Sequence, residues 1–391
     1  MAERRLRLGV AGLGRGFMLM RLGFSAHPKI EIVAGADPRP EARAAFAAEY
    51  NAPSFDSVEA LCADPAVEAV YIGTPHEFHA RHAIAAAKAG KHVLVEKPMA
   101  IGLDECRAMI DASRHAGTVL LIGHSHSYDA PIAQARQLIA SGAYGNLRMI
   151  TALNYTDFLY RPRRAAELDT AQGGGVMFSQ ASHQVDILRL LAGGMARSVR
   201  ASTGAWDRDR RSEGAYAAFL DFADGVCASL AYSGYGHFDS DELMGWIGET
   251  GGLKDPARYG EARKLLGQAD AGAEVALKNT RAYGTDAATP PGAPPHHEHF
   301  GFIIASCERA DLRPMPQGTL VYGDSEWALH PLAKPAVSRE AVLDELYDAV
   351  VNGRTPLHSG EWGMATMEVC LAILQSAAER REIALIHQVP A

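Results

Sequence analysis

Near its N-terminus the chain has an apolar run that breaks into Gly12-Leu13-Gly14-Arg15-Gly16-Phe17, and a second apolar run that ends in Asp37. Gly12 permits a tight turn from strand into helix, and Gly14 lets backbone N–H groups approach a pyrophosphate at the helix N-terminus. Asp37, 25 positions after Gly12, is placed to accept hydrogen bonds from ribose hydroxyls. The third fingerprint position holds Phe17 where Gly or Ala is usual. The pattern of strand, helix and later acid favours a Rossmann dinucleotide-binding domain over an ordinary glycine-rich turn.

Short apolar runs alternate with helical patterns through the first third of the chain. This alternation predicts a doubly wound parallel sheet, in which all strand C-terminal ends lie at one edge and a ligand binds where the strand order reverses. We expect strands at 6–11, 30–36, 69–73, 92–95 and 119–123, and helices near 15–26, 39–49, 77–89 and 102–116.

After about residue 128 the pattern changes to that of an α+β domain with a large, open, mostly antiparallel sheet. We therefore expect a Rossmann domain at 1–127 and a substrate and oligomerisation domain at 128–391. The C-terminal helices of the second domain could pack back on the first domain. We expect residues 251–299 to form an irregular excursion rather than a domain boundary. The expected helices are 129–141, 176–192, 338–352 and 361–380, and the expected strands are 147–158, 197–205, 214–222, 226–235 and 243–249.

The composition limits the classes of partner. The net charge of −8 is spread without long like-charge blocks, which argues against binding to nucleic acid or to a membrane surface. Five scattered cysteines without a CxxC pair suggest neither a disulfide framework nor a zinc site. No apolar run is long enough for a signal peptide or a membrane span. We expect a cytoplasmic protein with a small anionic substrate.

Two strand ends carry polar motifs. The run 69–73 leads into Thr74-Pro75-His76-Glu77-Phe78-His79, and the run 92–95 leads into Glu96-Lys97-Pro98. Because strand ends of a parallel sheet face the cofactor crevice, Lys97 could reach the reacting atoms of a substrate. The alternative is a surface lysine.

A third motif follows Gly173-Gly174-Gly175 on the predicted helix 176–192. Ser179 and His183 lie four residues apart and would share a helix face, with Asp186 three residues further on. A histidine here could carry a proton to or from a substrate hydroxyl, because its ordinary pKa is close to neutral. The alternative is a hydrogen-bonded core histidine.

With these motifs the chain resembles, over nearly its whole length, the Gfo/Idh/MocA family of nicotinamide-dependent oxidoreductases. The resemblance implies hydride transfer across the nicotinamide face, with Lys97 and His183 flanking the reacting carbinol as catalytic residues. It also implies a homodimer or homotetramer built by packing second-domain sheets. The family's aspartate, four residues before the histidine, falls on Ser179, which cannot supply a carboxylate. The cofactor-binding positions are Gly12, Gly14, Arg15, Gly16, Phe17, Asp37, Arg39, Thr74, Pro75, His76, His79, Glu96 and Lys97.

Several stretches, among them Phe178–Asp186 and Tyr232–Asp239, are similar to family members that act on a dihydrodiol of phthalate. A carboxylated substrate needs charged bidentate donors, which Arg161, Arg163 and Arg164 could supply, although arginines on a loop also serve solubility. The expected function is oxidation of a carbinol of a small carboxylated cyclic diol, such as a cis-dihydrodiol of phthalate, to the catechol. The alternatives are a sugar or cyclitol dehydrogenase and a non-catalytic dinucleotide sensor.

Histidines outside these motifs complete the expected substrate contacts. Neither the pair His124 and His126 nor the group at 296–299 has dependable zinc spacing, so no metal is expected. Asp37 disfavours a 2′-phosphate, although Arg39 could neutralise one, so NAD is expected with NADP possible. The expected substrate-binding residues are His124, His126, Tyr155, Arg161, Arg163, Ser179, His183 and His237.

Overall fold

A computed structural model describes residues 4–123, 125–268, 272–285, 294–334, 337 and 339–391. The chain divides into two compact units, each assembled from three stretches of sequence. The first unit comprises Met1–His124, Val275–Ala293 and Val337–Met364. The second comprises Ser125–Glu274, Pro294–Ala336 and Ala365–Ala391.

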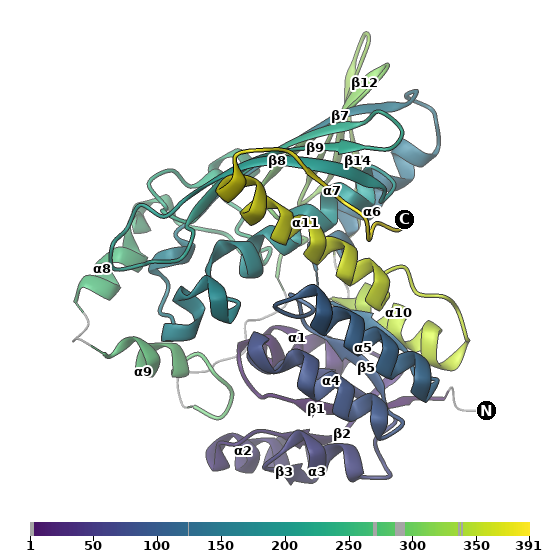
Figure 1. Cartoon of the computed structure of the whole chain (residues 1–391), viewed down its shortest axis with the longest axis vertical. Coiled ribbons are helices and arrows are strands. Elements are labelled where there is room, and N and C mark those ends of the chain that lie inside the picture. The colour runs from purple at the N-terminus through teal and green to yellow at the C-terminus, as the bar shows by residue number, and fades with distance from the viewer. Residues whose placement is uncertain (1–3, 124, 269–271, 286–293, 335–336, 338) are drawn as a thin grey trace. The chain divides into compact units, whose positions relative to one another are not determined.

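The first unit is built on a six-stranded, fully parallel sheet with the strand order β3-β2-β1-β4-β5-β6 (Figure 1). The chain moves outward from β1 to one edge and then restarts at β4 on the other side of β1, so the order reverses between β1 and β4. The predicted doubly wound parallel sheet is confirmed. The strands are β1 (Leu6–Ala11), β2 (Ile30–Ala36), β3 (Ser54–Phe55), β4 (Ala69–Ile72), β5 (His92–Val95) and β6 (Leu120–Ile122).

Every residue of the central strand β4 is buried, as expected for a parallel sheet covered on both faces. The helices have ordinary end signals. In α5, Asp104 and Glu105 occupy the first turn, Arg114 the last, and Gly117 closes the helix with a φ of 67°. The helices of this unit are α1 (Arg15–Ala26), α2 (Pro40–Tyr50), α3 (Val58–Ala63), η1 (His76–Phe78), α4 (His79–Lys88), α5 (Leu103–Ala116) and α10 (Glu340–Val351).

The second unit is built on a nine-stranded sheet with the order β14-β13-β12-β11-β7-β10-β9-β8-β15. Only the β7–β10 pair is parallel among the described strands of this sheet, which confirms the mostly antiparallel prediction. The strands are β7 (Leu147–Tyr155), β8 (Ala196–Gly204), β9 (Ala215–Phe222), β10 (Cys227–Ser233), β11 (Phe302–Cys307), β12 (Ala310–Met315), β13 (Gly318–Gly323), β14 (Trp327–Pro331) and β15 (Ile383–Ala384).

Helices cover one face of this sheet, where α6 (Ala130–Ala140), α7 (Ser182–Leu191) and α11 (Gly360–Glu379) lie in Figure 1. The strands alternate accordingly. In β9, Leu220 is buried whereas its neighbour Phe219 is 44% exposed. Oligomer formation through the exposed face stays a prediction. The remaining elements are η2 (His126–Tyr128), η3 (Phe158–Tyr160), η4 (Ala165–Leu168), η5 (Thr170–Gln172), the π-helical η6 (Met177–Ala181), η7 (Ser240–Met244), η8 (Pro256–Arg258), α8 (Glu261–Gly267) and α9 (Glu274–Asn279).

Two sequence predictions for the second unit were wrong or incomplete. The strand expected at 243–249 is absent from this part of the described chain, because the Asp239 side chain accepts from the Asp241 amide and starts the η7 turn. Trp246 then takes a φ of 58°, which is incompatible with a strand. The strands β11–β14 and β15 were not predicted. The excursion contains α8 and α9, and its proline-rich end at 289–293 lies outside the described residues.

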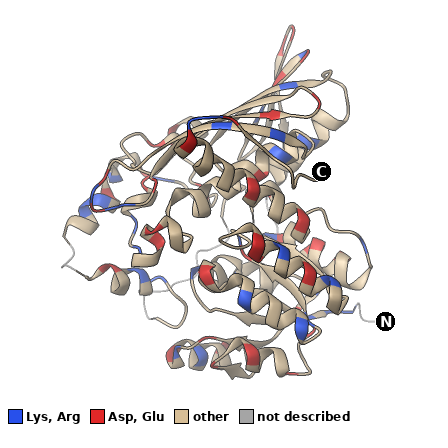
Figure 2. Cartoon of the chain, in the orientation of Figure 1, with Lys and Arg blue, Asp and Glu red and all other residues tan. Residues whose placement is uncertain are grey.

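Lys and Arg are interspersed with Asp and Glu along the described elements and do not gather on one of them (Figure 2). All five cysteines are free thiols, and three of them are buried. None of the helices in the described ranges is long and apolar enough to cross a membrane.

Four histidines should make the first unit less stable as the pH falls below about 6.5. Burial, the largest cause, lowers the pKa of His27, His79, His82 and His92 in the folded protein. Below the ordinary value the unfolded chain therefore binds protons that the folded chain does not, so acid favours unfolding by up to about 1.4 kcal/mol per pH unit for each such proton. Urea unfolding followed by circular dichroism at about pH 7.5 and about pH 5.5 measures this. An unchanged midpoint would contradict the assignment.

Candidate active site

The turn after β1 lies directly against the turn after β4. Gly12 has a φ of 92°, and a Cβ built on it would lie 2.8 Å from the carbonyl carbon of Gly73. A side chain at position 12 is therefore opposed by both backbone conformation and space. These two turns flank the reversal of strand order, which is where open parallel sheets bind their ligands.

The N-terminus of α1 fits an anionic group. Gly14 is the N-cap and offers no side-chain cap, so the first N–H groups of the helix have no partner from that residue. A Cβ built on Gly14 meets no atom within 4 Å, which leaves open space in front of the helix end. Open space in front of a helix N-terminus suits the pyrophosphate of a dinucleotide. Arg15 is exposed at the same turn.

Gly16 and Phe17 contribute differently from the other fingerprint positions. A Cβ on Gly16 would lie 3.0 Å from the Tyr71 hydroxyl oxygen, so Gly16 allows close packing of helix on strand. Phe17 is fully buried, and its ring contacts an aromatic cluster. Any cofactor contact of Phe17 would therefore be made by its backbone. The cluster consists of Phe24, Phe46, Tyr50 and Tyr283.

The acid at the end of β2 is bonded to the glycine turn. Asp37 is buried, and its Oδ2 accepts from the Leu13 amide at 2.9 Å. Its Oδ1 accepts from the backbone amide and the Nε of Arg39, both at 2.9 Å. Asp37 is thus placed beside the turn as expected, with Arg39 neutralising its charge. The choice of NAD over NADP stays a prediction.

Two alanine substitutions should separate cofactor binding from folding. Gly14→Ala should leave the thermal midpoint unchanged, because its Cβ meets no atom, yet raise the Kd for NAD about tenfold by filling the space of the pyrophosphate. Gly12→Ala should instead cost roughly 1–3 kcal/mol of folding free energy, because its backbone is left-handed. Thermal unfolding and a fluorescence titration with NAD measure both. A Gly14→Ala protein that binds NAD like wild type would refute the assignment.

His79 connects the turns that follow β4 and β5. Its Nε2 lies 2.8 Å from the carbonyl oxygen of Thr74, and its Nδ1 lies 2.8 Å from that of Pro98. The imidazole is fully buried between these acceptors. His79 therefore positions the turn that contains Lys97, and its imidazole is shielded from solvent, so a contact between His79 and the cofactor stays a prediction.

The Glu96-Lys97-Pro98 motif lies at the C-terminal end of β5, as predicted. Glu96 accepts a hydrogen bond from the Tyr71 hydroxyl at 2.8 Å, Lys97 is half-buried, and the Lys97–Pro98 peptide bond is cis. Thr74, Pro75 and His76 are half-buried at the neighbouring strand end, where Thr74 Oγ1 lies 3.0 Å from His82 Nδ1.

In the second unit, His183 is buried beside a second imidazole. It is 7% exposed, and its ring centroid lies 4.6 Å from that of His126. His183 Nδ1 accepts from the backbone amide of His126 at 3.4 Å. Both rings contact the buried ring of Phe300. The structure therefore brings together two of the predicted site residues, His126 and His183.

Ser179 occupies a π-helical segment, η6, which runs directly into α7. The regular α-helical spacing assumed between Ser179 and His183 is therefore wrong for this segment. The spacing of apolar residues could not reveal this, because a π-helical turn is a short insertion within an otherwise α-helical pattern. Ser179 is half-buried, so its substrate contact stays a prediction.

Asp186 belongs to a structural network. Its Oδ2 accepts from the Ser127 hydroxyl and its Oδ1 from the Thr366 hydroxyl at 3.0 Å. Thr366 in turn accepts from Arg189 at 2.9 Å, and Arg189 donates to the C-terminal segment through Gln388. The acid in the predicted polar stripe therefore fixes α7 in place.

The three loop arginines differ in their partners. Arg161 Nε donates to Asp157 at 2.8 Å, and its NH1 lies 3.7 Å from Glu249. Although burial alone would lower it, these carboxylates raise the pKa of Arg161. Arg164 pairs with Glu167 at 3.4 Å. Two of the three cations are thus already paired with acids of the chain.

Arg163 has no carboxylate within 4.0 Å of its guanidinium among the described residues. Its guanidinium carbon lies 3.7 Å from the Phe158 ring centroid, and NH2 donates to the Phe158 carbonyl at 3.0 Å. Its Nε is buried without a hydrogen-bond partner. Burial lowers the pKa of Arg163 to about 10. Arg163 is therefore a half-buried cation that stacks on Phe158, and the nearby charge of Glu167 partly offsets the effect of burial on its pKa.

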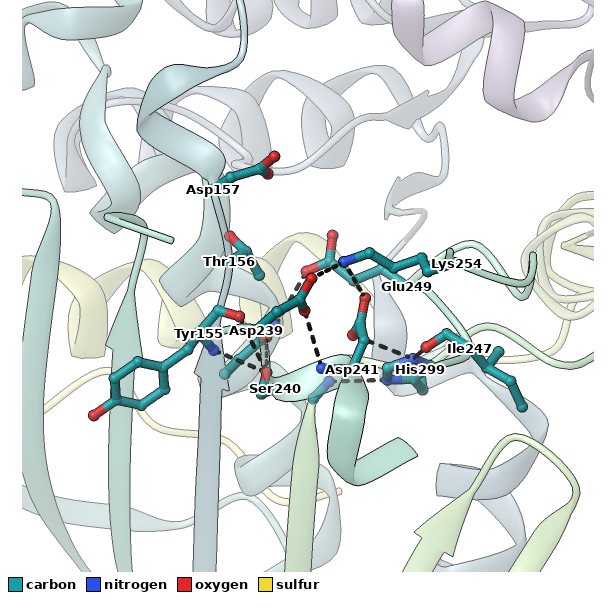
Figure 3. Close-up of polar contacts among 12 residues, drawn as sticks. Tyr155, Thr156, Asp157, Asp239, Ser240, Asp241, Ile247, Glu249, Lys254 and His299 are labelled. Carbon is teal, nitrogen blue, oxygen red and sulfur yellow. Dashed lines mark hydrogen bonds and ion pairs between the residues drawn. The ribbon is translucent and has the colours of Figure 1, made fainter. Parts of the chain in front are cut away.

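Figure 3 shows a polar cluster at the end of β7 and in η7 that sequence reasoning missed. Lys254 donates to Asp241 at 2.9 Å and also to Asp239. Asn154 donates to Glu249 at 3.1 Å. Burial, followed by the charge of Glu249, raises the pKa of Asp241. These residues come from separate segments, so no local sequence signal marks them. The Asn154 amide holds the Glu249 carboxylate, whose other oxygen lies 3.7 Å from Arg161.

The other predicted substrate residues are dispersed. Tyr155 is half-buried at the end of β7, and its ring contacts that of Phe238. His237 is exposed, with its Nε2 3.4 Å from Arg263. His124 lies outside the described residues.

The described residues contain two groups of three His, Asp or Glu side chains that could hold a metal ion. Within each group, the ligand atoms lie within 4.8 Å of one another. In one of them, His27 lies 3.5 Å from Asp344, which also pairs with Lys29. In the other, which includes Glu298, His126 Nδ1 bonds to Asp129 at 2.7 Å. Protein contacts account for these side chains, so we assign no metal, and the expectation of none stays a prediction.

The comparison with family models agrees with both units. Residues 6–124 match the oxidoreductase family with an NAD-binding Rossmann fold, and residues 132–254 match the GFO/IDH/MocA C-terminal domain.

Relatives match across nearly the whole chain. A 1-carboxy-3-chloro-3,4-dihydroxycyclohexa-1,5-diene dehydrogenase from Comamonas testosteroni is 46% identical and covers 95% of this chain and 94% of its own. An inositol 2-dehydrogenase from Rhizobium meliloti is 24% identical, and the match covers 97% of this chain and 99% of the relative. A candidate dehydrogenase from Bordetella bronchiseptica RB50, known from a crystal structure, is 39% identical. The match covers 97% of this chain and 100% of that chain, with a TM-score of 0.92. The chain therefore belongs to the Gfo/Idh/MocA family and is an NAD(P)-dependent oxidoreductase.

Proposed function

We propose that the protein oxidises one carbinol of a small carboxylated cyclic cis-diol, a cis-dihydrodiol of phthalate, to a hydroxy-ketone that tautomerises to the catechol. The observation that carries this proposal is Arg163. Its half-buried guanidinium has no carboxylate within 4.0 Å among the described residues, although the charge of Glu167 acts on it, and this suits a carboxylate brought by the substrate. A neutral polyol would leave this cation unpaired, which is costly in a desolvated site.

The relative from Comamonas testosteroni supports the same substrate class. Its name describes a ring that carries one carboxylate, two hydroxyls and two double bonds. Loss of two hydrogens gives an aromatic catechol when both carbinol carbons carry a hydrogen, as in a cis-dihydrodiol of phthalate, whereas the ring in the relative's name also carries chlorine on one of these carbons. The driving force of aromatisation lowers the demand on acid–base catalysis, so the enzyme has chiefly to orient its substrate.

Two side chains are proposed to act on the reacting carbinol. Bound NAD supplies the hydride acceptor. Lys97 precedes Pro98, whose carbonyl oxygen is hydrogen-bonded to His79. Its ammonium group would hydrogen-bond the carbinol oxygen and stabilise alkoxide character there. His183, buried on α7, would reach the same oxygen through Nε2. Ser179, which takes the place of the family aspartate, contributes no carboxylate.

The test is a substrate panel. Purified protein is mixed with NAD and with cyclic diols that carry two, one or no carboxylates, and the absorbance of reduced nicotinamide is followed. We expect kcat/KM to be highest for the dicarboxylate and about 10- to 100-fold lower for neutral diols, because a lost charged hydrogen bond costs about 1.5–3 kcal/mol. Preference for the monocarboxylate would mean that the substrate carries one carboxylate, like the ring in the name of the Comamonas relative. Activity confined to neutral polyols would refute the proposal.

A sugar or cyclitol dehydrogenase is the second candidate function. The likeness to an inositol 2-dehydrogenase over nearly the whole chain favours it. The same panel separates the two candidates. A non-catalytic sensor is disfavoured, because a binding module does not need Lys97 and His183 together.

A further inference from the structure

Two adjacent imidazoles in the second unit have Nδ1 partners of opposite type, a donor at His183 and an acceptor at His126. His126 and His183 are both buried, with 6% and 7% of their surface exposed, and their ring centroids are 4.6 Å apart. Each Nδ1 has a partner whose chemistry fixes which atom carries the proton.

The partner of His183 is a donor. The backbone amide of His126 donates to His183 Nδ1 at 3.4 Å, and an amide N–H cannot accept. Neutral His183 therefore carries its proton on Nε2. From that atom it can donate a hydrogen bond, but it has no lone pair to receive a proton.

The partner of His126 is an acceptor. Asp129 Oδ2 lies 2.7 Å from His126 Nδ1, and both side chains are buried. An ionised carboxylate only accepts, so Nδ1 carries the proton and neutral His126 has its lone pair on Nε2. Asp129 is the N-cap of α6, yet its side chain makes no capping bond. An aspartate at this position usually caps the helix, so orienting His126 takes precedence here.

We propose that His126, oriented by Asp129, is the proton acceptor for the substrate hydroxyl, and that His183 donates a hydrogen bond to the same oxygen. This rests on the proposed function. The carbinol C–H bond breaks and its hydrogen leaves with the electron pair to the dinucleotide. The O–H proton passes to His126 Nε2, and the C–O single bond becomes a double bond. Asp129 then supplies, from another segment, the carboxylate that is missing at Ser179.

Other charged groups around His126 favour the same role. Glu298, ahead of β11, has a carboxylate oxygen within 4.8 Å of the donor atoms of His126 and Asp129. Glu249 interacts electrostatically with His126, a contact that helps to lower the pKa of Glu249 against the effect of its burial. His183 is the neighbouring titratable group on α7. The three carboxylates stabilise the positive charge that His126 would acquire.

Matched glutamine variants distinguish the donor from the acceptor. Glutamine retains N–H donors but has no basic nitrogen. We expect His126→Gln to lower kcat about 10²- to 10³-fold and to remove the acidic limb of the pH profile of kcat, whereas His183→Gln should lower kcat about tenfold or less and keep that limb. Added imidazole should partly rescue His126→Ala and not His183→Ala. The reverse pattern would overturn the proposal.

If the His126 variants fail to fold, Asp129→Asn provides a second test, because asparagine keeps the shape of the site. It should lower kcat and shift the acidic limb, with an unchanged Kd for NAD. An unchanged pH profile would overturn the proposal. Loss of wild-type activity in EDTA with recovery on adding Zn²⁺ would also overturn it, because the imidazole would then be binding metal.

A readout that needs no turnover is the tautomer state of each ring. Nitrogen-15 NMR of histidine-labelled protein should find His183 protonated on Nε2 and His126 on Nδ1. The same tautomer at both rings would refute the inference. If the panel finds another substrate, the variants are measured on that substrate, so failure of the substrate assignment and failure of the acceptor assignment remain distinct.

Discussion

Replacing Lys97 by Met should lower kcat about 10³-fold while the Kd for NAD changes less than about threefold. Methionine is similar in length to lysine but carries no charge, so it removes the ammonium without leaving a large gap. The fold should survive, because Lys97 is half-buried and the turn around it is held through the Pro98 carbonyl by His79. Steady-state kinetics on the best substrate of the panel and an NAD titration measure the two quantities.

The matched control is Lys88→Met, which removes a charge from an exposed position at the end of α4. It should leave kcat unchanged. If Lys97→Met turned over at the wild-type rate, Lys97 would have no place in the chemistry.

Replacing Arg163 by Gln should raise KM for the carboxylated diol about 10- to 100-fold and change kcat/KM for a neutral diol less than about twofold. The reason is that the half-buried guanidinium of Arg163 has no carboxylate within 4.0 Å among the described residues, so most of its charge is available to the substrate. Steady-state kinetics on one carboxylated and one neutral diol provide the measurement.

Arg164→Gln is the control from the same loop, because Arg164 is already paired with Glu167. It should affect both substrates equally and weakly. Equal losses on both substrates in Arg163→Gln would mean that Arg163 supports the loop rather than recognising a carboxylate.

The first unit could be predicted closely because its strands are short apolar runs buried on both faces, as at 69–72. The edge of the second sheet could not. β14 has three exposed residues in succession from Trp327, so it lacks the alternation that marks a half-buried strand. The strand expected at 243–249 failed because the Asp239 side chain starts a turn, a local contact that overrides apolar patterning.

The candidate site was predictable where one short motif carries the chemistry. The glycine turn, Asp37 and Lys97 each follow a strand directly, so their positions follow from the parallel sheet. His126 was expected to contact substrate, yet its pairing with Asp129 and the stacking of Arg163 on Phe158 depend on contacts between side chains. Such contacts have no local sequence pattern.

The most direct measurement is a crystal structure of the protein with NAD and a carboxylated diol. We predict that Lys97 Nζ and His183 Nε2 both lie within about 3.2 Å of the same carbinol oxygen, beside the nicotinamide ring. A complex in which that oxygen contacts neither nitrogen, or in which the two nitrogens face different cavities, would contradict it.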